Sequence, residues 1–186
     1  SNVIIMGHTA MDMDALGACL GMRAICEYCN KSSHIVYDPK LLERKTKFAL
    51  TGAFSREELA RITISPSDSV DKVRSNTLVI VCDVHRPSLT MAPKLLEKAT
   101  KVMVIDHHRR AEEFIESPVF SYVEPSASST CELVTELIRY SSANPRIEIS
   151  PTYATIMLSG IFLDTTYFKS KNTGIRTFEA SMVLKE

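Results

Sequence analysis

The 186-residue sequence has no long hydrophobic run, no surplus of either charge and no even set of cysteines. No apolar run approaches the roughly 18 residues that a membrane-spanning helix needs, so no membrane span is expected. The 22 Lys and Arg residues balance the 22 Asp and Glu residues, so net charge would not attract a long nucleic acid. The five cysteines are odd in number and sit in apolar stretches, unlike the disulfide framework of a small secreted domain. A reducing, cytoplasmic location is therefore expected.

The composition is that of an ordinary folded domain. Hydrophobic residues make up 45% of the chain and charged residues 24%, which is enough apolar material for a sizeable core. No internal repeat, low-complexity segment or interdomain linker is evident in the sequence. We therefore expect residues 1–186 to form one domain.

Short apolar runs alternate with helical patterns along the chain. The β-branched and aliphatic runs are typical of buried parallel strands. Strands are expected at residues 3–6, 34–37, 77–82 and 101–105. Apolar spacings of three and four residues and a Ser-Pro helix start indicate the helices. Helices are expected at residues 14–29, 41–48, 57–62, 128–140 and 153–163. This alternation predicts an α/β fold with a mostly parallel central sheet flanked by helices.

Aspartates and histidines follow the expected strands at their carboxyl ends. They are His8, Asp12 and Asp14 after the first strand, Asp83 after 77–82, and Asp106, His107 and His108 after 101–105. Asp164 lies at the far end of the last expected helix. Because the carboxyl ends of parallel strands meet at one edge of a sheet, where ligands bind, we expect these side chains to converge.

Such a cluster predicts a metal centre. Four carboxylates brought close together would repel one another unless cations neutralised them, and two divalent ions supply the required charge. Oxygen and imidazole donors without a thiolate favour Mn²⁺ or Mg²⁺ over a structural zinc. Strand alternation turns the Cys82 side chain away from the face that Asp83 uses. Asp14 taken alone could also be the N-cap of the helix that follows it.

Two cysteines and one histidine have structural interpretations. Cys26 and Cys29 have C-x-x-C spacing, but no second pair completes a zinc site. Both fall on the apolar stripe of the expected helix, so core packing is expected. His34 lies on an expected strand, where a lone histidine is usually structural or on the surface.

Other polar residues near the expected site keep two interpretations. Three arginines could clamp a phosphate or be solvated, and the sequence leaves both open: Arg109, Arg110 and Arg176. Residues 126–130 open a helix, so their amides could meet a phosphate, although ordinary capping is expected.

Four segments together resemble the DHH phosphoesterase family. They are G-H-T-A-M-D-M-D-A at Gly7–Ala15, V-C-D-V-H-R-P around Asp83, D-H-H-R at Asp106–Arg109 and G-I-F-L-D-T around Asp164. Two further strings, E-P-S-A-S-S-T-C-E-L and N-T-G-I-R-T-F-E-A, are similar to GdpP-type cyclic dinucleotide phosphodiesterases of bacteria. The resemblance covers nearly the whole chain, and it is weakest over residues 41–73. It implies a DHH-type, Rossmann-like fold.

The resemblance also implies roles for individual residues. One metal ion would be held by His8, Asp12 and Asp83, and the other by Asp14, Asp83, His107 and Asp164, so that Asp83 bridges the two. Mn²⁺ is the favoured ion, with Mg²⁺ or Co²⁺ as alternatives. The catalytic residues would be Asp83, His107 and His108, and the substrate phosphate would contact His108 and Arg109. Asp106 and His85 would support the ligands from behind.

The implied activity is hydrolysis of cyclic di-AMP to linear pApA by water activated between two ions. Alternatives are hydrolysis of nanoRNA or 3′-phosphoadenosine phosphate within the same superfamily, or a regulatory module that binds nucleotide without turnover. The complete ligand set argues against the regulatory module. The expected partner is a small cyclic dinucleotide, not a long nucleic acid or a membrane. A homodimer of the full-length protein is a further option.

The glycine content bears on domain organisation. The family usually continues into a smaller, glycine-rich, substrate-binding domain of the DHHA1 type, whereas the six glycines here include no adjacent pair. We therefore expect residues 1–186 to be the DHH domain of a longer protein. A DHHA1-type domain and N-terminal membrane and sensor regions would lie outside this sequence, and this domain would lie in the cytoplasm.

Overall fold

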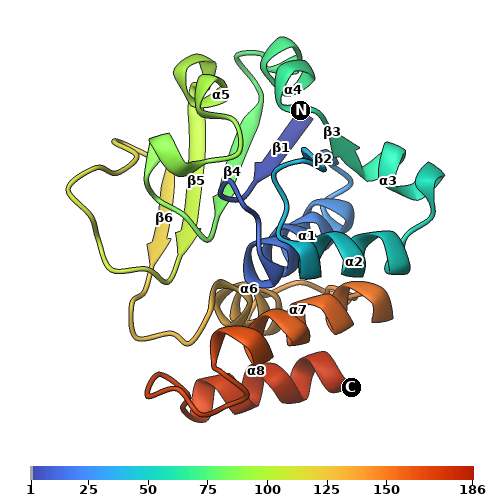
Figure 1. Ribbon diagram of the computed structural model, residues 1–186, viewed down its shortest axis with the longest axis vertical. Coiled ribbons are helices and arrows are strands. Elements are labelled where there is room, and N and C mark those ends of the chain that lie inside the picture. The colour runs from blue at the N-terminus through green and yellow to red at the C-terminus, as the bar shows by residue number, and fades with distance from the viewer. Residues whose placement is uncertain (1) are drawn as a thin grey trace.

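The computed structural model describes residues 2–186 and contains a six-stranded sheet (Figure 1). The strands are β1 (Asn2–Met6), β2 (Ser32–Val36), β3 (Thr63–Ile64), β4 (Leu78–Cys82), β5 (Lys101–Asp106) and β6 (Phe120–Val123). Their order is β3-β2-β1-β4-β5-β6, and every neighbouring pair is parallel. The direction of winding reverses between β1 and β4, which is the switch point where ligands bind in open α/β sheets.

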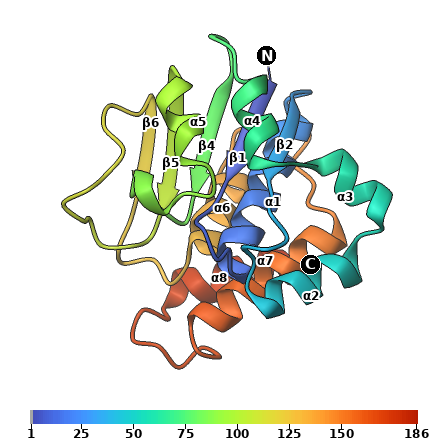
Figure 2. The ribbon, with the colours of Figure 1, turned by 45° about the horizontal axis from the view of Figure 1, so that its top comes forward.

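Helices cover both faces of the sheet. They are α1 (Met13–Tyr28), α2 (Arg44–Ala53), α3 (Arg56–Ile62), α4 (Pro66–Lys72), α5 (Pro93–Lys98), α6 (Thr130–Arg139), α7 (Pro151–Asp164) and α8 (Ile175–Lys185), with a 3₁₀ turn at Pro87–Leu89. Figure 2 shows α4 and α5 on the near side of the strands and α1 and α6 on the far side. Helix α7 packs on α1, and α8 lies farthest from the sheet (Figure 1). The predicted α/β architecture is confirmed.

None of these helices, within residues 2–186, is long and apolar enough to cross a membrane.

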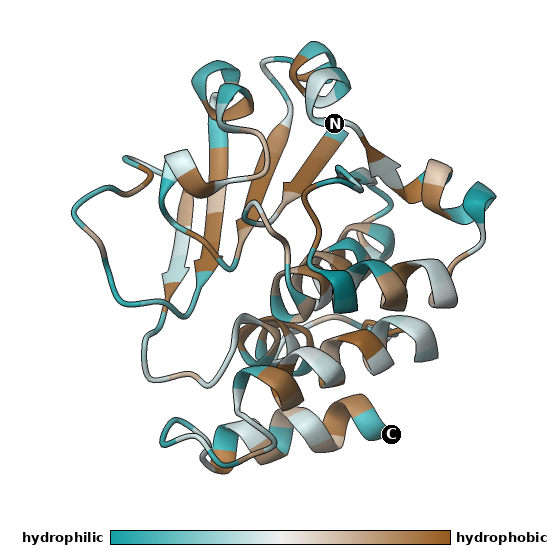
Figure 3. Ribbon diagram, viewed as in Figure 1, coloured by the Kyte–Doolittle hydropathy of each residue, from teal (hydrophilic) through white to brown (hydrophobic). Residues whose placement is uncertain are grey.

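The core follows from the hydrophobic runs. The central strands β1, β4 and β5 are hydrophobic over most of their length (Figure 3), as expected of strands covered on both faces. Helix α1 approaches α6 and α7 closely because Gly17 and Gly160 lack side chains. A Cβ atom at Gly17 would lie 2.6 Å from the Cys131 Sγ, and one at Gly160 would lie 2.9 Å from it. Helix α1, which follows the loop after β1, is therefore held in place by tight packing against α6 and α7.

Most expected elements are confirmed, with shifted ends. Helix α2 begins and ends several residues later than the expected 41–48. The short elements β3, α4 and α5 were not expected, and neither were β6 and α8. Strand β6 is half exposed at the sheet edge, and α8 exposes Ile175, Phe178 and Met182, so neither has the apolar pattern of a buried element.

The structure decides between the two interpretations of Asp14 and corrects the expectation for Cys29. The N-cap is Asp12, whose carboxylate accepts a hydrogen bond from the Ala15 amide at 2.9 Å, and the Asp14 carboxylate turns instead toward α6. Cys26 is buried as expected, but Cys29 is exposed because it lies just beyond the last residue of the helix.

Candidate metal centre

The carboxyl ends of β1, β4 and β5 hold a cluster of acidic and imidazole side chains. His8 lies in the loop after β1, Asp83 follows β4, and His107 follows β5. Asp14 comes from the first turn of α1, and Asp164 is the last residue of α7. All of the ligands expected from the sequence are therefore brought together, although they span most of the chain.

The first part of the cluster is the His8 group, made up of His8, Asp12 and Asp83, whose donor atoms lie within 4.8 Å of one another. The His8 Nε2 is 3.5 Å from Asp12 Oδ1 and 3.4 Å from Asp83 Oδ2. The His8 Nδ1 lies 2.6 Å from the carbonyl oxygen of Thr9, so it carries the proton that is donated there. This leaves Nε2 free to face a cation.

The second part is the His107 group, made up of Asp14, His107 and Asp164. Its donor atoms also lie within 4.8 Å of one another. The His107 Nε2 is 3.1 Å from Asp164 Oδ2 and 3.8 Å from Asp14 Oδ2. It is also 3.5 Å from Asp83 Oδ1. Asp83 therefore directs one carboxylate oxygen to each group.

Asp83 is held in an unusual backbone conformation. Its φ is 63°, in the left-handed region that costs a residue with a side chain about 1–3 kcal/mol. Its amide donates to the Ile105 carbonyl oxygen at 2.9 Å, and its carboxylate is only 3% exposed. The turn directs the side chain into the space between the two groups.

Asp106 lies behind the cluster. Its Oδ2 accepts a hydrogen bond from the His85 Nδ1 at 2.5 Å, and its Oδ1 accepts one from the His108 Nδ1 at 2.7 Å. The His85 Nε2 accepts a hydrogen bond from the Ala111 amide at 3.0 Å, so the single ring proton of neutral His85 is on Nδ1. His85 and Asp106 thus form a support that reaches His108.

Like charges dominate the centre. Every ion pair that its four aspartates form within residues 2–186 is with a histidine. Burial, with the nearby charges of Asp83 and Asp164, raises the pKa of Asp14 well above its usual value. Burial opposes the charged form of His8, but hydrogen bonds to Asp12 and Asp83 outweigh it and raise its pKa to about 11.

His107 has a raised pKa, as His8 does, and the whole set of donors suits divalent cations. The pKa of His107 is raised to about 10, because contacts with Asp164, Asp14 and Asp83 outweigh the opposing effect of burial. In the metal-free protein, protons on these histidines partly neutralise carboxylates that cations would neutralise more fully. A third close group, made up of Asp83, His107 and His108, overlaps the other two, and this set of oxygen and imidazole donors suits two divalent ions.

A family model described as the N-terminal domain of the DHH family matches residues 2–161. The chain belongs to the DHH family. It is 43% identical over 185 residues to the cyclic-di-AMP phosphodiesterase GdpP of Bacillus subtilis, covering 100% of this chain and 28% of that protein. It is 38% identical to the cyclic-di-AMP phosphodiesterase PdeA of Listeria monocytogenes, covering 98% of this chain. The chain thus spans about a quarter of the length of these relatives.

The chain is also similar to more distant proteins, and a solved structure among them shares its fold. The bifunctional oligoribonuclease and PAP phosphatase NrnA of Thermus thermophilus is 29% identical over 171 residues, covering 92% of this chain and 45% of that protein. The crystal structure of an exopolyphosphatase-related protein from Bacteroides fragilis superposes with a TM-score of 0.78 at 20% identity. That match covers 99% of this chain and 52% of the other, and it confirms the DHH-type fold.

The arginines of this DHH domain have different surroundings. Arg109 borders a cavity of about 440 Å³ that is also lined by His8, Asp83 and His108. The Arg110 guanidinium instead stacks over the Phe114 ring, 4.0 Å from its centroid. Arg176 binds the Glu136 carboxylate through two nitrogens, each at 2.7 Å, which ties α8 to α6. Of these three arginines, Arg109 is the one beside the metal centre, and Arg86 lines the same cavity.

Helix α6 makes contacts with the metal centre that the sequence did not reveal. Ser129 caps this helix by accepting a hydrogen bond from the Glu132 amide at 3.1 Å. The amides of Thr130 and Cys131 donate to the Asp14 carboxylate, and the Thr130 hydroxyl donates to Asp83. The expectation of ordinary capping over residues 126–130 was therefore incomplete. The family-like string around Thr130 was the only available signal.

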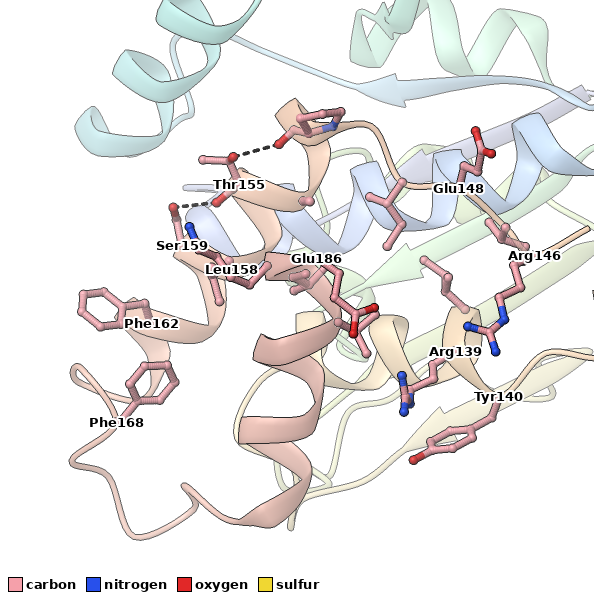
Figure 4. A pocket seen from close by; sticks show the side chains of 18 residues that line it. Arg139, Tyr140, Arg146, Glu148, Thr155, Leu158, Ser159, Phe162, Phe168 and Glu186 are labelled. Carbon is pink, nitrogen blue, oxygen red and sulfur yellow. Dashed lines mark hydrogen bonds between the residues drawn. The ribbon is translucent and has the colours of Figure 1, made fainter.

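A cavity of about 1150 Å³ is separate from the metal centre. It lies between α7, α8 and the segment after α6, and its wall includes Arg139, Arg146, Leu158 and Phe162 (Figure 4). None of the clustered aspartates or histidines lines it. The clustered side chains, including His8, Asp83 and Asp164, instead line the smaller cavity at the sheet edge.

Proposed function

We propose that this DHH domain catalyses metal-dependent hydrolysis of a phosphodiester in a cyclic dinucleotide, converting cyclic di-AMP to linear pApA. The observation that carries the proposal is the placement of Asp83, which belongs to the His8 group and also lies in a close group with His107 and His108, with one oxygen facing each side of the centre. Two-metal hydrolytic sites hold their ions about 3.5 to 4 Å apart, and one shared carboxylate suits that spacing. Two relatives that match nearly the whole chain are named as cyclic-di-AMP phosphodiesterases, which supports the substrate.

Two divalent ions are the proposed cofactors, with Mn²⁺ favoured and Mg²⁺ or Co²⁺ as alternatives. One would be held by His8, Asp12 and Asp83. The other would be held by Asp14, Asp83, His107 and Asp164. When bound, such a pair supplies an activated water and neutralises charge on the reacting phosphoryl group.

The side chains around the ligands would bind the substrate. The His108 Nδ1 is occupied by its hydrogen bond to Asp106, so the opposite ring nitrogen, Nε2, is the one left for a phosphate oxygen. The His108 side chain is 55% exposed and lines the same cavity as Arg109. We assign these two residues to the phosphate, with His85 and Asp106 as their support.

The alternatives fit less well. NrnA, which acts on oligoribonucleotides and PAP, is 29% identical to this chain, against 43% for the Bacillus subtilis phosphodiesterase. A regulatory module without turnover would not need every one of the metal ligands that this centre retains. Cyclic dinucleotide hydrolysis is therefore the function we favour.

The length of the relatives supports a proposal about the whole protein. Because this chain corresponds to about a quarter of each, we propose that residues 1–186 are one DHH domain of a longer protein. A DHHA1-type domain would bind the remote parts of the substrate, and a membrane anchor would leave this domain in the cytoplasm. Binding energy from remote parts of a substrate orients the reacting phosphorus, so the longer protein is expected to turn over cyclic di-AMP faster.

Chromatography of the reaction products tests the proposal. The chain and a longer form would be incubated with Mn²⁺ and a panel of cyclic and linear dinucleotides, with bis-p-nitrophenyl phosphate as a small ester that needs little positioning. We expect cyclic di-AMP to yield pApA, faster with the longer form, and the small ester to differ less between the two. Cleavage of linear dinucleotides alone, with cyclic di-AMP intact in both forms, would refute the assignment.

A further inference from the structure

Thr130, the first residue of α6, contacts two of the proposed metal ligands although it is fully buried. Its backbone amide donates a hydrogen bond to Asp14 Oδ2 at 2.7 Å. Its side-chain hydroxyl donates to Asp83 Oδ1, also at 2.7 Å. One residue thus joins a carboxylate from α1 to a carboxylate that follows β4.

Both of these contacts lie on the same side of the centre. Asp83 Oδ1 is the oxygen that faces the His107 Nε2 at 3.5 Å, and Asp14 Oδ2 faces the same nitrogen at 3.8 Å. The other oxygen of Asp83, Oδ2, faces His8 and has no contact with Thr130. Thr130 therefore contacts two carboxylates that face His107, and only one of them, Asp83, belongs to the His8 group.

The hydroxyl is well suited to fix a carboxylate without blocking it. Each carboxylate oxygen can accept more than one interaction, so Asp83 Oδ1 can accept the Thr130 proton and still face a cation. The side chain of Asp83 projects from a left-handed backbone position at the end of its strand. The Thr130 hydroxyl, as a donor at a fixed distance, therefore determines how the Asp83 carboxylate is rotated.

We propose that Thr130 is a positioning residue that sets the geometry of the metal position at the His107 group. This inference rests on the proposed function, since it assigns a role toward the second of two ions. Thr130 reaches no substrate, because it has no exposed surface. Its effect is transmitted through the orientation of Asp14 and Asp83.

The chain offers closely matched variants. Thr130→Val replaces the hydroxyl with a methyl group of similar size, and Thr130→Ser keeps the hydroxyl. Thr135→Val is the control, because Thr135 is buried in the same helix but its hydroxyl donates to the Cys131 carbonyl oxygen at 2.7 Å. Loss of that hydroxyl removes a buried hydrogen bond without touching a proposed ligand.

The test is calorimetric titration of Mn²⁺ into the metal-free chain. His8→Ala and His107→Ala identify which of the two binding steps belongs to each group. Because removal of an outer hydrogen-bond partner of a ligand typically costs about 10–100-fold in metal affinity, we expect Thr130→Val to weaken the His107-dependent step by that factor. The His8-dependent step should be weakened less, because Thr130 contacts only one ligand of that group, and both steps should stay close to wild type in Thr130→Ser and Thr135→Val.

The possible outcomes separate this inference from the proposed function. Two normal steps in Thr130→Val, or an equal loss in Thr135→Val, would overturn the positioning role and leave the proposed function standing. If wild type bound no Mn²⁺, the proposed function would fail as well. Thermal unfolding checks that each variant folds. Should Thr130→Val not fold, Thr130→Ala compared with Thr130→Ser decides in the same way.

Discussion

At the residue scale, Asp83 is the side chain that connects the two ligand groups, because it belongs to the His8 group and also faces His107. One of its oxygens faces His8 and the other faces His107. Removing it should therefore affect both ions, whereas removing Asp12 or Asp164 should affect one. No other residue of the centre has contacts with both histidines that are proposed to bind metal.

We predict that Asp83→Ala abolishes hydrolysis and lowers Mn²⁺ occupancy at both positions. The loss of activity should exceed the roughly 10–100-fold typical of removing a group that only supports a ligand. His34→Ala is the control, because His34 lies on β2 and belongs to neither ligand group. Activity assays and metal analysis measure both effects. Near-normal hydrolysis by Asp83→Ala would show that the carboxylate does not bridge two ions.

A second prediction at this scale concerns protons. The raised pKa values of His8, about 11, and His107, about 10, mean that both rings are protonated in the metal-free protein near neutral pH. These protons stabilise the metal-free fold fully below pH 6.5, and this contribution is lost as the pH rises through 10 and 11. Cations must displace them, so Mn²⁺ binding should release protons, and the affinity should rise about tenfold per pH unit for each one.

Titration of Mn²⁺ in buffers with different ionisation enthalpies measures this release directly. The observed heat should vary with the buffer at pH 7.5, and the variation should shrink in His8→Ala. A heat of binding that is the same in every buffer would contradict the prediction.

At the scale of elements, the segment that follows β5 is held by His85. Its ring joins Asp106 to the Ala111 amide, and its carbonyl oxygen accepts from the Ile115 amide at 2.8 Å. We predict that His85→Ala lowers kcat by about 10–100-fold, as is typical for an outer partner of a metal site. His85→Asn keeps a donor for Asp106 and should retain more activity than His85→Gln, which keeps an acceptor for Ala111.

Steady-state kinetics on the three variants measure the effect. If His85→Gln were the more active, the contact with Ala111 would matter more than the support of His108 through Asp106. Equal activity of all three variants and wild type would show that His85 does not support the site.

The contact between α1 and α7 gives a prediction about stability. A Cβ atom at Gly160 would lie 2.9 Å from the Met13 carbonyl oxygen and 3.0 Å from the Asp14 Cα. Gly160→Ala should therefore destabilise the fold by about 1–3 kcal/mol through overpacking. Gly52→Ala is the matched control, because Gly52 is in α2 with nothing within 4 Å of its Cβ position, and alanine there should be neutral or stabilising. Urea unfolding gives both free energies, and an unchanged value for Gly160→Ala would be contrary to this packing.

The elements that the sequence predicted are those with strong local patterns. Strands β1, β4 and β5 are continuous apolar runs, and α1 is apolar over most of its length, so their residues alone indicate them. Strand β6 and helix α8 are half exposed and depend on their neighbours. Thr130 could be placed at a helix start, but its contacts with Asp14 and Asp83 exist only because α6 meets α1 in the folded chain.

At the scale of the whole molecule, the doubly wound sheet explains why a centre can form from distant residues. The winding reverses between β1 and β4, so the loops that carry His8 and Asp83 open at neighbouring strand ends. This convergence was predictable, because parallel strands end at one edge. The division of Asp83 between two groups was implied only by family resemblance, since the direction of each oxygen depends on a backbone turn that no pattern indicates.

The measurement that tests the two-metal centre most directly is anomalous scattering from crystals of the chain grown with Mn²⁺. We expect two peaks about 3.5 to 4 Å apart at the carboxyl ends of β1 and β4, with one oxygen of Asp83 near each. The His8 and Asp12 side chains should ligate one peak, and Asp14, His107 and Asp164 the other. A single peak, or a metal bound at Cys26 and Cys29 instead, would contradict it.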